Sequence, residues 1–170
     1  MFIKLLSVTF ISLFANCIQP QPETQLAELD REPIIASEIN RSELVAFAKS
    51  YLGTTYQYAS ADPMKGFDCS GFVYFVFKHF NIDMPRSSKE YTSLQPKLKP
   101  EEFKAGDVLV FYGFNDNTQI GHVGIICEAD GMNSKFIHSS SGIVKGIIIS
   151  NLGSELYTRR FYKCVDVISL

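Results

Sequence analysis

The stretch FDCSGFVYFVFKHF, residues 67–80, decides the fold of this chain. Its apolar side chains lie on almost every side of the helix that the spacing predicts from residue 69 to 80: Phe72, Val73, Phe75, Val76, Phe77 and Phe80. A helix that is apolar all round belongs in the interior of a domain. We therefore expect this helix to be central, with the rest of the fold packed around it.

An earlier segment predicts a second helix, which begins at Asn40. Asn40 and Glu43 have the spacing of a capping box, which satisfies the first free backbone donors of a helix. Helical spacing then joins the apolar residues Leu44, Phe47, Ala48, Tyr51 and Leu52. Gly53 is a suitable stop, and a looser segment connects it to the central helix.

The second half of the chain changes from helical to strand-like patterns. Short segments rich in β-branched residues occupy positions 107–112, 122–128, 135–140, 143–150 and 161–168. The links between them are too short for crossover helices, so neighbouring strands should be antiparallel. Helices followed by an antiparallel sheet predict the α+β class.

Length and charge limit the possible functions. The chain has 170 residues, enough for one domain with a substantial core, and a net charge of −2. Since it lacks a polybasic surface, nucleic acid is not an expected partner.

The N-terminal residues resemble an export signal. Lys4 precedes an apolar run at residues 5–15, which is shorter than the ~20 residues that a membrane-spanning helix needs. The run ends at Cys17 in LFANC, which resembles a bacterial lipoprotein processing site. We expect Cys17 to be lipidated, and the alternative is a plain signal peptide in which Cys17 is incidental.

The segment after Cys17 is polar and rich in proline. Residues 18–40 include QPQP and have little apolar periodicity, which is typical of an extended tether. We expect a signal peptide at 1–17, a flexible tether at 18–40 and a catalytic domain at 41–170.

Cys69 is the candidate nucleophile, because it lies where a loop becomes the central helix. Backbone N–H groups and the helix dipole favour a thiolate at such a position, so we expect its thiol to ionise readily. Gly71 leaves room for close approach by a strand or a substrate, and Asp68 and Ser70 can cap the helix or position groups at the site. The alternative is a buried structural cysteine.

His122 and His138 lie in two consecutive predicted strands, and their relative position depends on the hairpin. A two-residue turn would place the imidazoles on opposite faces of the sheet. A three-residue loop at 129–131, with Gly131 at positive φ, would pair His122 with His138. We predict the three-residue loop, with both rings on the face that meets the start of the central helix.

This arrangement predicts a thiol hydrolase. His122 would accept the Cys69 proton, or hold the thiolate as an ion pair, and His138 would orient it. One cysteine and two histidines could instead bind catalytic zinc, but no Cys-x-x-Cys or His-x-x-x-His spacing supports this. We expect no metal and no cofactor.

Five motifs in this order resemble the NlpC family of cell-wall cysteine peptidases. They are FDCSGFV at 67–73, MPRSS at 84–88, GDVLVF at 106–111, GHVGI at 121–125 and FIH at 136–138. The resemblance extends from about Arg41 to the C-terminus. It implies a papain-like core, a Cys-His-His triad and cleavage of peptidoglycan stem peptides, typically between D-γ-glutamate and a diamino acid.

The resemblance also implies a role for Tyr56. This residue matches the family's upstream tyrosine, which would donate to the oxyanion together with the Cys69 backbone N–H. Ala59-Ser60 replaces the family's paired glycines, and the following loop contains Pro63 and Met64, so substrate access is expected to differ.

Further residues are candidates for substrate contact or for structure. With Asp68 and Ser70, we expect Arg86 and Ser88 to bind substrate, although a helix-capping loop explains the last two equally well. Cys127 with Cys164 is the only disulfide that spares Cys69 and Cys17.

Together these features predict an exported, monomeric, membrane-anchored envelope lipoprotein. It would cleave stem peptides through a thioester at Cys69. The alternatives are an inactive lipoprotein that binds wall peptides, and a thiol amidase or acyltransferase of the same fold.

Overall fold

The computed structural model describes residues 39–169. The predicted signal peptide, Cys17 and almost all of the predicted tether lie outside the described residues. Within residues 39–169, no helix combines the length and the apolar character needed to cross a membrane.

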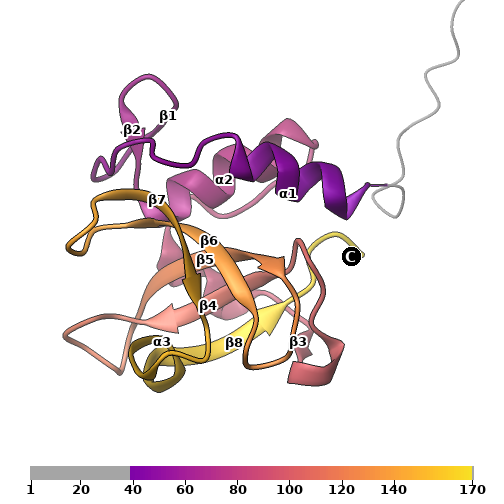
Figure 1. Ribbon diagram of the computed structural model, residues 1–170. Helices are drawn as coiled ribbons and strands as arrows, with labels where there is room; N and C mark the ends of the chain where they lie inside the picture. Colours follow the sequence, from indigo (N-terminus) through magenta and orange to yellow (C-terminus); the bar gives the residue numbers. More distant parts are fainter. Residues whose placement is uncertain (1–38, 170) are drawn as a thin grey trace, which may run out of the picture. The chain divides into compact units, whose positions relative to one another are not determined.

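The described chain consists of helices and an antiparallel sheet, as predicted (Figure 1). The helices are α1 (Arg41–Lys49), α2 (Cys69–His79) and α3 (Glu155–Arg160), with short 3₁₀ helices at Ser88–Ser93 and Pro100–Glu102. The main sheet contains β3 (Lys97–Leu98), β4 (Val108–Tyr112), β5 (Ile120–Glu128), β6 (Lys135–Ser140), β7 (Gly146–Asn151) and β8 (Phe161–Val165). Its order is β3-β8-β4-β5-β6-β7, and a separate hairpin is formed by β1 (Ala61–Asp62) and β2 (Gly66–Phe67).

Helix α2 is the central helix that the sequence predicts. Phe72, Val73 and Phe77 are fully buried. They belong to the same apolar cluster as Val123 and Ile125 of β5, so α2 covers one face of the sheet. Each large side chain removed from water in this way contributes about 1.5–3 kcal/mol.

Helix α1 begins at the predicted cap. The Asn40 Oδ1 accepts hydrogen bonds from the backbone N–H groups of Ser42 and Glu43, at 2.9 and 3.4 Å. Glu43 binds the Asn40 side chain rather than its backbone, at 3.2 Å. Leu52 is 47% exposed, so the prediction that it continues the apolar face is wrong, because the helix ends before it.

A second apolar layer lies on the other face of the sheet. It contains Phe111 and Phe136, and Tyr157 of α3 packs on both rings, with centroid distances of 5.4 and 4.8 Å. Neither α3 nor the insertion of β8 between β3 and β4 follows from the sequence pattern.

The hairpin between β5 and β6 differs from the prediction. Ile126 pairs with Phe136 instead of Ser134, and the loop spans residues 129–134. Ser134 closes this loop, since its Oγ accepts from the Asp130 N–H at 2.8 Å and donates to the Gly131 carbonyl at 2.7 Å. The predicted register is therefore wrong by two residues. An even shift leaves every side chain on its predicted side, so the histidines still share a face.

That shared face is not the predicted one. Val123 and Ile125 point toward α2, whereas His122 packs against Phe111 of the second layer, with ring centroids 5.9 Å apart. The imidazoles therefore lie on the face that carries Tyr157.

The predicted disulfide is also wrong. Cys127 and Cys164 are free thiols. They face different layers, Cys127 the α2 side and Cys164 the Phe111 side, so they cannot meet across the sheet.

Candidate active site

The start of α2 is held by a tight turn of backbone and side chains. Asp68 caps the helix, and its Oδ1 accepts from the Gly71 N–H at 2.6 Å. A Cβ at position 71 would collide with the carbonyl of Ser60, whose oxygen accepts from the Asp68 N–H at 3.0 Å. Gly71 therefore permits the predicted close approach, and the approaching group is the backbone of the β1–β2 segment.

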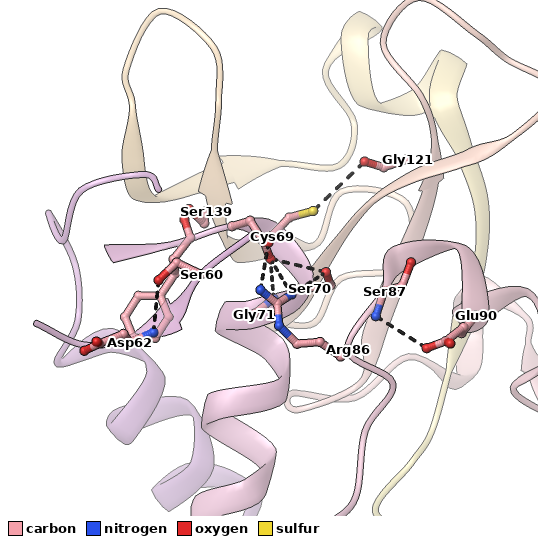
Figure 2. A network of polar contacts seen from close by, with 12 residues as sticks. Ser60, Asp62, Cys69, Ser70, Gly71, Arg86, Ser87, Glu90, Gly121 and Ser139 are labelled. Atoms are coloured by element: carbon pink, nitrogen blue, oxygen red, sulfur yellow. Dashed lines mark hydrogen bonds and ion pairs between the residues drawn. The ribbon is translucent and has the colours of Figure 1, made fainter. Parts of the chain in front are cut away.

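Cys69 reaches from this helix end to the strand that carries His122. Figure 2 shows its sulfur pointing toward Gly121, whose carbonyl oxygen lies 4.0 Å away. The half-buried thiol thus contacts the backbone of the residue that precedes His122.

The environment of Cys69 does not favour a thiolate at rest. Burial, followed by the nearby Asp68 carboxylate, raises the pKa of its thiol to about 11. Backbone groups of Val123, Ser70 and Cys69 itself act in the opposite direction but do not offset burial. The prediction that the helix start makes this thiol ionise readily is therefore wrong, because desolvation exceeds the benefit of the helix end. A neutral thiol needs a base at the moment of attack.

His122 and His138 form a direct hydrogen bond. The His122 Nε2 lies 2.9 Å from the His138 Nδ1, with the rings at 89°. Burial lowers the pKa of His122 well below its usual value, and the neighbouring His138 and Arg160 lower it further. Burial also lowers the pKa of His138 to about 4. Both rings are neutral at pH 7, so one donates and the other accepts.

The hydrogen bonds of His138 indicate which tautomers of the two imidazoles leave His122 able to act as a base. If His122 donates from Nε2, its Nδ1 is a free acceptor and can serve as a base. His138 then carries its proton on Nε2, which lies 2.9 Å from the Ser150 Oγ and 3.3 Å from the Tyr157 hydroxyl. The sequence indicates neither partner, because both lie on segments whose register and packing are not visible in it.

The predicted substrate-binding residues line one cavity, and three of them, Asp68, Ser70 and Arg86, are hydrogen-bonded to one another. The Arg86 guanidinium binds Asp68 through two hydrogen bonds of 2.9 Å. It also reaches the Ser70 hydroxyl at 3.3 Å (Figure 2). The Ser87 N–H donates to the Glu90 carboxylate at 3.4 Å, so the capping explanation also holds for this loop.

Tyr56 lines the same cavity as Cys69. The chain at Tyr56 runs alongside Phe67: the Gln57 N–H donates to the Phe67 carbonyl at 3.1 Å, and the Phe67 N–H donates to Thr55 at 3.2 Å. Burial raises the pKa of Tyr56, and the nearby Cys69 and Asp68 contribute. The tyrosine is therefore a neutral hydrogen-bond donor in the cavity that contains Cys69.

Two cavities meet at Gly121. The smaller, of about 450 Å³, is lined by residues that include Tyr56, Cys69, Arg86 and Ser88. The larger, of about 730 Å³, is lined by residues that include His122, His138, Tyr157 and Arg160. Because Gly121 lines both, a substrate lying across it would contact the thiol side and the imidazole side together.

No cluster with the composition of a metal centre accompanies these residues. Within residues 39–169, no group of three or more His, Cys, Asp or Glu side chains is arranged to hold a metal ion. The three-ligand zinc alternative therefore has no geometric support in that part of the chain.

Comparison with known proteins identifies related sequences and folds. Residues 53–166 match the model of the NlpC/P60 family. The chain is 32% identical to the probable endopeptidase NlpC of Escherichia coli over 68% of this chain and 70% of that protein. It is 30% identical to the gamma-DL-glutamyl hydrolase of Bacillus subtilis over 91% of this chain, but it spans only 34% of that longer protein. A crystal structure of an NlpC/P60 family protein from Bacillus cereus superposes with a TM-score of 0.68 at 25% identity, over 76% of this chain and 41% of that one.

Proposed function

Since this chain belongs to the NlpC/P60 family, we propose that it is a cell-envelope cysteine endopeptidase that cleaves peptidoglycan stem peptides. The proposed bond joins D-γ-glutamate to the diamino acid, which is the bond that the family resemblance implies; the Bacillus subtilis relative is named only for a gamma-glutamyl bond. The observation that carries the proposal is the contact of the Cys69 sulfur with Gly121, beside the hydrogen-bonded pair of His122 and His138.

The first half of the reaction forms a thioester. The Nδ1 of His122 takes the thiol proton while the Cys69 sulfur attacks the amide carbonyl. The oxygen that becomes negative accepts hydrogen bonds from the Tyr56 hydroxyl and the Cys69 backbone N–H. The protonated His122 then gives its proton to the departing amine of the diamino acid, and the acyl group stays on sulfur.

The second half releases the acyl group. Water loses a proton to His122 as it attacks the thioester carbonyl, and the sulfur leaves as a thiolate. The thiolate recovers the proton from His122, which restores the neutral pair, and the freed glutamate γ-carboxylic acid loses its own proton to solvent. His138, held by Ser150, keeps the His122 ring oriented throughout.

Substitution of Cys69 tests the proposal. Cys69→Ala should abolish cleavage of purified peptidoglycan, measured as shortened stem peptides by mass spectrometry of muropeptides. Cys127→Ala is the matched control, because this thiol is buried on the α2 side of β5 and should not affect the chemistry. Full activity of Cys69→Ala would exclude the thioester mechanism.

The same digest separates the alternative functions. An inactive binding protein would bind peptidoglycan and release no shortened stem peptide even when unsubstituted. A thiol amidase or acyltransferase would modify other amides and leave the stem peptides at full length.

The location and anchoring are part of the proposal. The family relationship supports an exported, envelope-associated enzyme, and LFANC at residues 13–17 supports lipidation at Cys17. We expect the tether at 18–40 to hold a monomeric catalytic domain, 41–170, away from the membrane. Labelled palmitate should appear in the full-length protein and be lost in Cys17→Ala; labelling that persists would exclude this anchor.

A further inference from the structure

The larger cavity contains a buried arginine that the proposed chemistry does not use. Arg160, at the end of α3, is only 9% exposed and lines the cavity together with His122 and His138. Its Nε donates to the Tyr112 carbonyl at 3.0 Å. Its guanidinium lies 5.6 Å from the ring centre of Phe114 and 6.0 Å from that of Tyr157.

Arg160 has no acidic partner among residues 39–169. Arg41 and Arg86 each form an ion pair with a buried carboxylate, whereas Arg160 forms no ion pair in that part of the chain. Nε makes its only hydrogen bond within the described residues, so the two Nη groups have no protein acceptor. Because neither Nη atom is fully buried, both keep access to solvent, and the planar fork of a guanidinium matches a carboxylate. The cavity thus offers an unpaired cation to an anionic group.

The chemistry of the site indicates which part of a substrate enters this cavity. The acyl part stays on the Cys69 sulfur with its oxygen near Tyr56, and both residues line the smaller cavity. The departing amine must receive its proton from His122, which lines the larger one. If the proposed function holds, the larger cavity receives the leaving group.

We propose that Arg160 is a specificity residue that binds a free carboxylate of the leaving group. In a stem peptide this carboxylate has two possible sources. One is the side-chain carboxylate of a diaminopimelate-type diamino acid, and the other is the C-terminal carboxylate of a tripeptide that ends at the diamino acid. Phe114, Ile143 and Val144 are exposed apolar side chains that also line this cavity.

Four synthetic tripeptides of L-Ala, γ-linked D-Glu and diaminopimelate test this proposal. They carry the side-chain group and the C-terminal group as carboxylate or carboxamide, in all four combinations. With the unsubstituted protein, converting one of these carboxylates to the amide should lower kcat/KM about tenfold or more, as for loss of a charge-assisted hydrogen bond. The position at which the amide lowers kcat/KM identifies which of the two carboxylates Arg160 binds.

The variant Arg160→Gln should abolish this discrimination, so that the carboxylate and carboxamide forms are cleaved with similar kcat/KM. Arg159→Gln removes a neighbouring exposed arginine and should keep the discrimination. Because Arg160→Gln could destabilise α3, thermal unfolding is measured alongside. The comparison of the four tripeptides with the unsubstituted protein does not depend on the stability of any variant.

The tripeptide rates distinguish failure of the proposed role of Arg160 from failure of the proposed endopeptidase function. Cleavage of all four tripeptides at similar rates by the unsubstituted protein would overturn the role of Arg160 and leave the proposed function standing. Discrimination that persists in Arg160→Gln would overturn it as well. Cleavage of none of the four would overturn the endopeptidase proposal, and the leaving-group assignment with it.

Discussion

Gly124 leaves space for the histidine pair, and Gly124→Ala should disturb it. A Cβ at this position would lie 2.6 Å from the Phe136 Cδ2 and 3.0 Å from the His138 Cβ. Carbon atoms normally pack at ~3.5–4.0 Å, so the Phe136 ring would have to move by about 1 Å. Phe136 is fully buried between Phe111 and Tyr157 and cannot move freely.

The displacement would reach the catalytic pair through His138. The His138 ring lies on the Phe136 ring, with centroids 4.8 Å apart, and makes the 2.9 Å bond to His122. A shift of ~1 Å at a catalytic group can cost about 10²-fold in rate, so we expect kcat of Gly124→Ala to fall by that order. Overpacking should also lower the free energy of unfolding by about 1–3 kcal/mol.

The assay measures kcat and KM on a stem peptide, together with urea unfolding. Ile125→Val is the control, since it removes a methyl group from the next residue on the α2 side and should cost about 0.5–1.5 kcal/mol with little change in kcat. A Gly124→Ala protein that is folded and as active as the unsubstituted one would refute the reasoning.

Three further outcomes are expected. Burial lowers the pKa of His122, so its inactivating protonation moves to lower pH and the acid limb of the pH–rate profile should have its midpoint well below 6.5. A midpoint at about 6.5 would contradict this. Ser150→Ala should lower kcat about tenfold or more with little change in KM, because His138 loses the hydrogen-bond acceptor that favours its productive tautomer. Ser150→Thr should restore the rate, and equal rates in all three proteins would argue against this role of Ser150. Arg41→Met leaves the buried Asp107 without its ion-pair partner at 2.7 Å, so the free energy of unfolding should fall by about 2–4 kcal/mol in urea titrations. A loss within experimental error would show that this ion pair does not stabilise the fold.

Much of the fold follows from local patterns. The all-round apolar character of residues 69–80 predicts the central helix, and the capping residue Asn40 predicts the start of α1. The strand segments and their antiparallel pairing follow from short β-branched runs and short links. These features depend on side-chain spacing within a few residues, which a sequence displays directly.

The candidate site was only partly predictable. Cys69, His122, His138 and Tyr56 are identifiable by their motifs, and the even register keeps the histidines together despite the different loop. Arg160 has no recognisable motif, since its meaning comes from burial beside residues that are distant in sequence.

The sequence alone therefore determined the elements, their order along the chain and the identity of the reactive groups. Only the tertiary structure decided that β8 lies beside β4, that the imidazoles face Tyr157 and that the Cys69 thiol is neutral at rest. The physical reason is that periodicity is local, whereas desolvation and hydrogen-bond partners depend on which distant segments pack together. The pKa of Cys69 is an example, because burial at the junction of α2 and β5 outweighs the helix end that the sequence reveals.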